Sequence, residues 1–451
     1  MQLSKTLETH GHAPVNPPQM ATSLEGLGVP TYVAEALLLK LLNIEPKINL
    51  LQLTQRLAIS SNLIQLLINQ LREHGYVEVL QPDSLKTPVN GAQGVNSSIL
   101  RYQLTSSGES QAKAALKKDG YVGPVPVPLR DYQYMAKQQS LRHSPITQEL
   151  LRQALNDVYG VEQYVDLIGP AINSGRAILF YGDPGTGKSY IANRIIRSLN
   201  TPVYIPYAVF VSGNIVRLFT PQHHHELAPS SEQSDIFFNQ HHDRRWVLCS
   251  RPLVQVGGEL TMNMLEVSKC DATGAWLAPL QMMANNGIFI IDDFGRQSMP
   301  TERLLNRWIV PMEYQIDYLS LPNGQQSTIP FVTTLIFSTN LTPKEIGDPA
   351  FLRRLGYKVH FPPLDIQDYK ALWQAQCELQ NFLYDDAPLQ HLLLLHKRDQ
   401  VAYYPCIPKD ITRICHDLMV YKKLESRLTA VLVESAWQIY FSDEQLKRMT
   451  L

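Results

Sequence analysis

Eight residues at positions 182–189, GDPGTGKS, have the types and the spacing to bind phosphate. Their three glycines allow tight turns that aim backbone N–H groups at phosphate oxygens, and the lysine could reach the terminal phosphates of a nucleotide. The serine hydroxyl is of the kind that binds Mg²⁺ beside such phosphates. The candidate binding residues are Gly182, Asp183, Pro184, Gly185, Thr186, Gly187, Lys188 and Ser189.

The flanking residues predict the elements that would hold this stretch. The apolar run AILFY at 177–181 predicts a buried strand that ends at the first glycine. Apolar residues then return at helical spacing, at Ile191, Ile195 and Leu199. A helix that begins at the loop would direct its positive dipole end at a bound phosphate. Because strand, loop and helix in this order are the context of a P-loop, we interpret the stretch as one rather than as an ordinary Gly/Pro turn.

Two other apolar runs end in polar residues suited to the same chemistry. The run IFII at 288–291 is followed by Asp292 and Asp293, and the run TLIFST leads to Asn340. Asp292 would hold Mg²⁺ together with Ser189, and Asp293 would orient the attacking water. Asn340 would contact the γ-phosphate. The predicted ligands are therefore ATP and Mg²⁺.

In this order the motifs resemble those of the AAA+ ATPases, with Walker A at the P-loop, Walker B at 288–293 and sensor 1 at Asn340. The resemblance covers about residues 128–451. It implies an α/β fold, in which a parallel P-loop sheet is sandwiched by helices, carries β insertions and is followed by an all-α lid. The segment DPAFLRRLGYKVHFPP at 348–363 resembles the part of the family that carries an arginine finger just before the fifth core strand. This implies Arg353 or Arg354 as a finger that acts on ATP of a neighbouring subunit, and hence a homo-oligomer with a hexamer-like ring.

Two positions depart from the family pattern. The family places sensor 2, an arginine, at the start of the third lid helix, where this chain has Lys409, with Arg413 one turn later. Because lysine is a point charge rather than a planar fork, Lys409 is either a substitute for that arginine or an exposed surface residue. Asp293 stands where most members carry glutamate, so its carboxylate is one methylene shorter. We expect slower hydrolysis or a loop that lies closer to the nucleotide, and not a loss of activity.

The stretch between Lys188 and Asp292 is longer than a helix–strand–helix connection requires. Residues 202–219 and 244–265 read as β insertions within it. A further hairpin is predicted at 315–334, with Asn323 and Gly324 as its turn. A hairpin before sensor 1 resembles an insertion of the MoxR-like and helicase-like AAA+ groups, and the wider pattern resembles bacterial ATPases described as having chaperone activity.

A polar stretch with five histidines separates the two β insertions. The histidines are His223, His224, His225, His241 and His242. Their spacing fixes no ligand geometry for a metal ion, so the pattern favours a mobile loop at 222–242 over a metal site.

The first 120 residues read as a separate unit. Three helices, near 33–41, 51–57 and 61–74, are followed by a strand, a loop at 81–98 and a second strand. This order, with the pattern Y-x-L-T-x-x-G, resembles a winged helix, a module that usually binds DNA. Residues 1–120 nevertheless hold ten Lys or Arg against nine Asp or Glu, which leaves little charge to neutralise phosphates. The balance favours protein docking over DNA binding.

The amino-acid composition excludes several classes of function and location. Lys and Arg number 40 and Asp and Glu 41, so no global charge attracts nucleic acid or a membrane surface. Five scattered cysteines indicate a reducing compartment. No window approaches the roughly 18 apolar residues of a membrane span, and the first residues lack a signal-peptide pattern. We therefore expect a cytoplasmic protein without membrane insertion.

The predicted layout has four parts. They are a winged-helix-like interaction domain at 1–120, a Pro-rich linker at 121–130, an AAA+ nucleotide-binding core with β insertions at 131–364, and a helical lid at 365–451. The leading functional hypothesis is an oligomeric AAA+ ATPase that remodels or disassembles protein complexes, with an unidentified protein client. One alternative is an ATP-dependent DNA-acting or transcription-regulating factor, and another is a nucleotide-dependent scaffold with little turnover.

Overall fold

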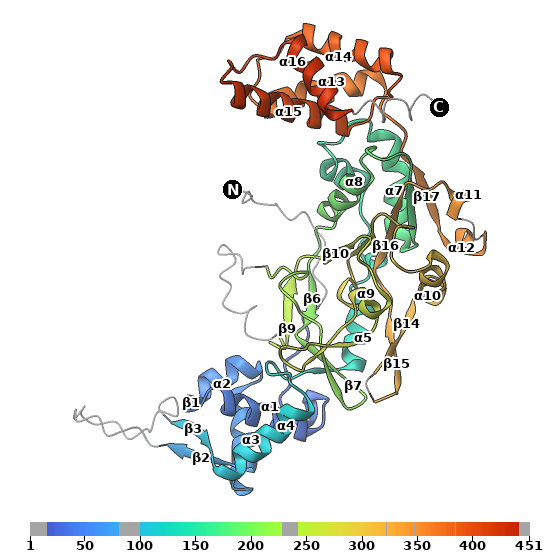
Figure 1. Cartoon of the computed structure of the whole chain (residues 1–451). Coiled ribbons are helices and arrows are strands. Elements are labelled where there is room, and N and C mark those ends of the chain that lie inside the picture. Colours follow the sequence, from blue (N-terminus) through green and yellow to red (C-terminus); the bar gives the residue numbers. More distant parts are fainter. Residues whose placement is uncertain are drawn as a thin grey trace.

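The computed structural model describes residues 16–80, 100–227, 242–321, 323–346, 349–383 and 385–441. The molecule is elongated, with N-terminal helices at one end, a parallel sheet in the middle and a helical lid at the other end (Figure 1). Within the described residues no helix is long and apolar enough to cross a membrane. Short 3-10 helices lie at Glu25–Leu27 (η1), Leu141–His143 (η2), Ile196–Ser198 (η3) and Met262–Leu265 (η4).

Five parallel strands form the central sheet, in the order β10-β13-β16-β5-β17. They are β10 (Leu253–Val256), β13 (Ile288–Ile291), β16 (Thr334–Thr339), β5 (Ile178–Tyr181) and β17 (Tyr357–His360). The strands are short apolar runs because helices cover both faces, as parallel sheets require. The fold class expected from the sequence is confirmed: an α/β P-loop sheet of AAA+ type.

Alternate residues of β5, β13 and β16 enter two different cores. Ile178 and Phe180 of β5 pack with the helices that precede and follow that strand, whereas Leu179 between them faces the opposite core. This alternation follows from the two-residue period of a strand. The first face is covered by α6 (Gln148–Ala154), α7 (Glu162–Ser174) and α8 (Lys188–Ile195), and the second by elements that include α9 (Leu280–Met283), α10 (Thr301–Tyr314) and α12 (Pro349–Arg354). A short helix, α11 (Pro343–Ile346), precedes α12.

One of the predicted β insertions belongs in part to the central sheet. Residues 244–265 contain β9 (Trp246–Cys249) and β10, and β10 pairs in parallel with β13. The interpretation of β10 as an insertion strand is therefore wrong. Its Val254 and Val256 are buried against the same core as β13, which is why the run is apolar. The strand β9 pairs with β6 (Val203–Pro206) in a separate two-stranded ribbon.

A second sheet joins β4, which precedes the P-loop, to strands inserted between Lys188 and Asp292, in the order β11-β12-β8-β7-β4. Its members are β4 (Val127–Pro128), β7 (Ala208–Val211), β8 (Asn214–Arg217), β11 (Ser268–Lys269) and β12 (Trp276–Leu277). Phe210 and Trp276 are partly buried against hydrophobic cores, as ordinary packed aromatics are.

The predicted hairpin before Asn340 is present as β14 (Ile316–Ser320) and β15 (Gln326–Pro330). Gly324 in its turn has a φ of 76°, a conformation that glycine adopts without steric cost. The amide of Asn323 donates to the Ser212 carbonyl at 3.0 Å, so the turn touches the turn of the β7–β8 hairpin. Gln133 of α5 (Leu129–Gln138) also donates to the Thr328 carbonyl.

The N-terminal unit follows the predicted order of helices and strands. It contains α1 (Thr31–Ile44), β1 (Ile48–Asn49), α2 (Leu50–Leu57), α3 (Ser61–Glu73), β2 (Val77–Leu80), β3 (Arg101–Leu104) and α4 (Ser106–Lys118), with an antiparallel sheet in the order β1-β3-β2. The predicted loop at 81–98 lies outside the described residues. Gly108 of α4 has to be a glycine, because a Cβ there would collide with the Tyr76 carbonyl.

The segment predicted as a Pro-rich linker is packed against both of its neighbours. Tyr121, Val125 and Val127 are buried, and Val127 and Pro128 form β4 of the second sheet. Arg245, itself buried in an ion pair with Asp243, donates to the Leu27 carbonyl at 2.8 Å and to the Pro126 carbonyl at 3.3 Å. The N-terminal unit is thus joined to the β insertions by buried contacts as well as by the chain.

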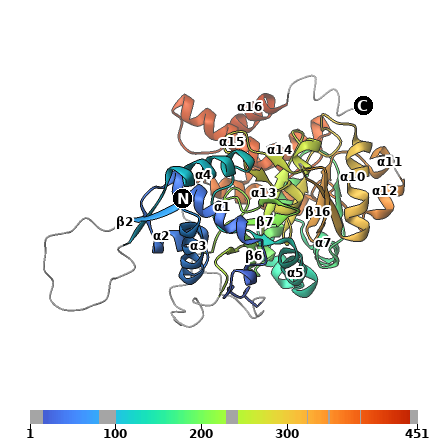
Figure 2. The ribbon, with the colours of Figure 1, turned by 90° about the horizontal axis from the view of Figure 1, so that it is seen from below.

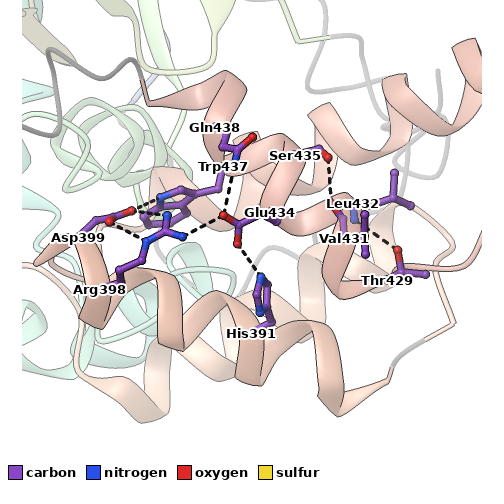
Figure 3. Close-up of polar contacts among 10 residues, drawn as sticks. All are labelled: His391, Arg398, Asp399, Thr429, Val431, Leu432, Glu434, Ser435, Trp437 and Gln438. Carbon is purple, nitrogen blue, oxygen red and sulfur yellow. Dashed lines mark hydrogen bonds and ion pairs between the residues drawn. The ribbon is translucent and has the colours of Figure 1, made fainter.

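The lid consists of α13 (Ile366–Leu379), α14 (Asp386–Asp399), α15 (Cys406–Lys422) and α16 (Ala430–Tyr440) around one core. The last of these helices begins at Ala430, where Thr429 caps it by accepting from the Leu432 N–H. Figure 3 shows the polar contacts that join α14 to α16: Glu434 accepts from Arg398 and pairs with His391, and the Trp437 indole donates to Asp399 at 2.7 Å.

Candidate nucleotide-binding site

The P-loop connects the carboxyl end of β5 to the start of α8. Gly182, Gly185 and Gly187 all have positive φ, at 145°, 83° and 88°. A side chain at Gly182 would collide with the Phe361 carbonyl, and one at Gly185 would lie 2.5 Å from the Cys406 sulfur. The loop therefore needs glycine both for its turns and for the close approach of its neighbours.

Lys188 lies folded into the loop, with 6% of its surface exposed. Its Nζ donates to the carbonyls of Gly182 and Asp183, both at 2.8 Å, and to Asn340 Oδ1 at 2.9 Å. Burial lowers the pKa of Lys188, opposed by the negative charges of the nearby aspartates. The structure thus brings together the candidate lysine at the start of α8 and the candidate sensor directly after β16.

Ser189 and Asp292 form the second contact between the predicted groups. The Ser189 hydroxyl donates to Asp292 Oδ1 at 2.9 Å, and the Gln255 amide donates to Asp292 Oδ2 at 3.2 Å. A hydroxyl and a carboxylate side by side are hard oxygen donors, and Mg²⁺ needs only one or two such protein ligands beside phosphate and water. This donor set fits Mg²⁺.

Asp293 follows in a tight turn and is exposed. Its φ of 47° places it in the left-handed region, which is sparsely populated by residues other than glycine, although aspartate tolerates it better than most. The side chain of Gln297 spans this turn through four hydrogen bonds.

The lid touches the P-loop just before α15 begins. The Tyr404 hydroxyl donates to Asp183 Oδ2 at 3.0 Å, and the Cys406 N–H donates to the Gly185 carbonyl at 3.4 Å. Burial, with the hydrogen bond to Asp183, raises the pKa of Tyr404 to about 12, so the phenol stays protonated at neutral pH. Lys409 lies about one helical turn further along α15 and is exposed.

Arg353 and Arg354 lie at the opposite edge of the sheet. Both belong to α12, which ends just before β17, and the following Gly356 N–H donates to the carbonyl of Ala177 ahead of β5. Figures 1 and 2 place α12 beside α10, and Arg354 Nε contacts Glu313 Oε2 of α10 at 3.1 Å. Arg353 is exposed. The structure does not bring either arginine to the P-loop of the same chain.

The histidine stretch divides into a packed part and a part outside the described residues. His224 is buried; its Nδ1 accepts from the Thr220 N–H, and its Nε2 therefore donates to the Met283 carbonyl. Burial lowers the pKa of His224 to about 4, so it is a neutral core residue and not part of a mobile loop. Residues 228–241, His241 among them, lie outside the description. Across the described ranges no group of His, Cys, Asp or Glu residues is arranged to hold a metal ion.

A cavity of about 580 Å³ lies on the lid, away from the P-loop, and is lined by residues that include Leu393, Lys397 and Tyr403. Its buried His396 contacts the Tyr369 hydroxyl and the Val401 carbonyl, at 2.7 and 2.9 Å. Both ring nitrogens are satisfied, so nothing marks this cavity as a ligand site.

Several residues at the P-loop edge were not predicted from the sequence. Gln255, Gln297 and Tyr404 carry no motif of their own, and each reaches the site from a different element. Their position was the usable signal: Gln297 follows Asp293 by four residues, and Tyr404 lies two residues before the helix in which sensor 2 was expected.

Two family models match parts of the chain. A domain of unknown function, DUF8689, matches residues 365–439, and the model of the parvovirus non-structural protein NS1 matches residues 92–203. No curated protein matches the chain.

Two solved structures show weak similarity. RuvB of Thermotoga maritima, a Holliday junction branch migration motor, has a TM-score of 0.34 and 14% identity, covering 69% of this chain and 75% of that one. NtrX of Brucella abortus, in complex with ADP, has a TM-score of 0.37 and 13% identity, covering 72% of this chain and 58% of that one. Likenesses of this size assign neither an activity nor a partner to this chain. It is the sheet order and the P-loop geometry that give the chain an AAA+ type of P-loop fold.

Proposed function

We propose that the chain binds ATP with Mg²⁺ at the carboxyl edge of the sheet and hydrolyses it to ADP and phosphate. The observation that carries this proposal is the direct bonding of Lys188 to Asn340 and of Ser189 to Asp292, which joins the start of α8 to the residues that follow β16 and β13. In this assignment Lys188 and the loop N–H groups hold the phosphates, and Ser189 and Asp292 hold Mg²⁺. When bound, Mg²⁺ supplies charge neutralisation of the terminal phosphates.

Asp293 and Asn340 complete the proposed catalytic groups within one chain. Asp293 follows the metal-binding carboxylate directly and is exposed, so it can contact water at the γ-phosphate. Asn340 is held by the ammonium of Lys188 at 2.9 Å, which fixes its amide beside the loop. Lys409 would act from the lid, where its neighbour Cys406 already contacts Gly185.

We infer that the active form is a homo-oligomer, with a hexamer-like ring as the arrangement. Arg353 and Arg354 precede β17 whereas the P-loop follows β5, so the length of a four-residue strand, about 13 Å, separates the two edges. An arginine from this edge can serve a nucleotide only in another copy of the chain. Its charge would stabilise the transferring phosphoryl group.

The activity we favour is ATP-driven remodelling or disassembly of protein complexes, of the MoxR-like, chaperone-like kind. The N-terminal unit, a winged-helix-like interaction domain in this proposal, is attached through buried contacts such as that of Arg245 with Leu27, so a client bound there could respond to movement of the core. Its nearly balanced charge supports a protein client rather than DNA.

The proposal is tested by two measurements on the full chain. Phosphate release with ATP and Mg²⁺ should be measurable, and light scattering should show a larger oligomer fraction with ATP than with ADP, because a ligand that prefers the assembled state stabilises it. Tight ATP binding without turnover would point to a scaffold, and turnover stimulated by DNA would point to the DNA-acting alternative. A chain that stays monomeric at tens of micromolar with ATP would remove the ring. Affinity capture with Asp293→Asn, in which hydrolysis is blocked, should retain the client.

A further inference from the structure

The turn that follows β13 is fastened by a single glutamine side chain. The Gln297 amide nitrogen donates to the carbonyls of Gly257, Asp292 and Asp293, at 3.3, 3.2 and 3.3 Å, and its oxygen accepts from the Gly295 N–H at 2.9 Å. Gly257 directly follows β10, so the same side chain ties the turn to the neighbouring strand.

Neighbouring strands hold the turn from both sides as well. The Asp292 N–H donates to the Val256 carbonyl of β10 at 2.7 Å, and the Phe294 N–H donates to the Ser338 carbonyl of β16 at 2.8 Å. Asp293 stands between these two fixed points with its φ of 47°. A strained residue of this kind persists only where the surrounding structure determines its conformation, and such residues cluster at functional sites.

The two aspartates differ in what holds them. Two of the three hydrogen bonds to the Asp292 carboxylate come from outside the turn, from the Ser189 hydroxyl and the Gln255 amide, and the third comes from the Asp293 N–H at 3.1 Å. At Asp293 the carbonyl accepts from Gln297 and from the Arg296 N–H, so its backbone conformation depends on the turn. An aspartate has a single methylene between backbone and carboxylate, so its backbone dihedral angles set where the charge can lie.

We propose that Gln297 is a positioning residue that acts through Asp293. It holds the left-handed turn and thereby places the short carboxylate for the hydrolytic step, while nucleotide and Mg²⁺ binding rest on Lys188, Ser189 and Asp292. This inference rests on the proposed ATP hydrolysis. It also explains how the chain works with aspartate at this position, because a fixed turn replaces the reach of a longer side chain.

The decisive variant is Gln297→Met, which keeps the length of the side chain and removes all four hydrogen bonds. We expect kcat to fall about 10- to 100-fold, since a misplacement near 1 Å can cost that much. The dissociation constant for ATP with Mg²⁺ should stay within about 2-fold. Gln297→Glu can still accept from Gly295 but cannot donate to the three carbonyls. It should likewise lower kcat and leave the dissociation constant for ATP nearly unchanged, and it replaces the methionine variant if that variant does not fold.

Gln139 provides a matched control. Like Gln297 it bridges backbone groups, since it donates to the Tyr204 carbonyl and accepts from the Tyr204 N–H, but it is buried and lies away from the P-loop. Gln139→Met should lower thermal stability and leave kcat close to the wild-type value. If kcat of Gln297→Met stays within about 2-fold of wild type, or if both glutamine variants lose kcat alike, the positioning role is overturned.

Amide hydrogen exchange on the same proteins measures how firmly the backbone of the turn is held, and it does not depend on ATP turnover. Exchange at Gly295, whose N–H is bonded to Gln297, should become at least about 10-fold faster in Gln297→Met and should be unchanged in Gln139→Met. Unchanged exchange in residues 292–297 would refute the inference. If the wild-type protein does not hydrolyse ATP but exchange is still faster in Gln297→Met, the proposed function is refuted. The role of Gln297 in holding the turn then still stands.

Discussion

The two edges of the central sheet carry their positive charges in opposite ways. At the carboxyl edge Lys188 is buried and bonded to three acceptors of its own chain. At the other edge Arg353 is exposed, and Arg354 contacts Glu313 on the surface of α10. Burying a charge is costly unless partners compensate it, whereas an exposed ion pair contributes only about 0–1 kcal/mol. The charge of Lys188 is thus compensated within its own chain, whereas Arg353 and Arg354 lie at the other edge on α12, which is where the proposal needs groups that act on a second chain.

The largest effect on ATP binding should come from removing the charge of Lys188 at the carboxyl edge. We expect Lys188→Met to weaken ATP binding by at least about 100-fold, because a buried charge-assisted contact to phosphate is lost. Lys40 is the matched control: it is equally buried in the N-terminal unit, where its Nζ donates to the Tyr121 carbonyl at 3.2 Å. Lys40→Met should destabilise folding and leave ATP affinity unchanged. Calorimetry and thermal denaturation of both variants separate the two effects, and equal ATP affinity in Lys188→Met and wild type would refute the P-loop assignment.

The arginines of the second edge should act between subunits, which mixtures of two variants can test. Replacing both Arg353 and Arg354 by alanine should lower turnover by about 10³-fold, the scale of an arginine finger, with ATP binding retained. Mixing this variant with Asp292→Ala should restore part of the activity, since an intact P-loop of one chain then meets an intact arginine of the other. Each parent at the same total protein concentration is the reference. Mixtures as inactive as their parents would contradict action between subunits.

Much of the carboxyl edge could be predicted because its residues follow apolar runs of unmistakable type. The runs before Gly182, Asp292 and Asn340 predicted strands, and parallel strands that end at one edge bring such residues together. The partners Gln255 and Gln297 could not be found in this way. Their roles depend on which strands pair, and the apolar run of β10 looks the same in the sequence whether it joins the sheet or an insertion.

The proline-rich segment at 121–130 shows the same limit. Its composition is that of a spacer, but its apolar residues, Tyr121, Val125 and Val127, are buried between two units. Burial of this kind depends on a surface supplied by residues far away in the chain, among them Leu27 and Ile215. Composition alone does not reveal such a surface.

The two edges should also differ in their dependence on pH. Burial lowers the pKa of Lys188 from its usual value of 10.5, whereas arginine stays charged throughout the accessible range. ATP binds the charged ammonium, so its dissociation constant should rise with pH once the pH exceeds the pKa of Lys188, by up to about tenfold per unit. Lys188→Arg should show a flat profile over the same range. A flat profile in the wild type as well would mean that the ammonium does not contribute to binding.

The smallest effect on ATP affinity should come from the contact between the lid and the P-loop. The Tyr404 hydroxyl donates to Asp183 Oδ2 at 3.0 Å, which offsets part of a negative charge within the phosphate-binding loop. Tyr404→Phe removes that donor and keeps the ring, so the carboxylate of Asp183 should repel the phosphates more strongly and ATP affinity should fall about 2- to 5-fold, the scale of about 1 kcal/mol for one hydrogen bond. Asp183→Asn removes the charge, so the tyrosine substitution should have no further effect in that background. Tyr403→Phe, at the adjacent residue whose ring packs at a tilt against Tyr369, should leave ATP affinity unchanged. Calorimetry on the wild type, the two single variants Tyr404→Phe and Asp183→Asn and their double variant measures the coupling between the two side chains. Additive effects on ATP affinity would mean that the lid tyrosine does not act on the nucleotide site through Asp183.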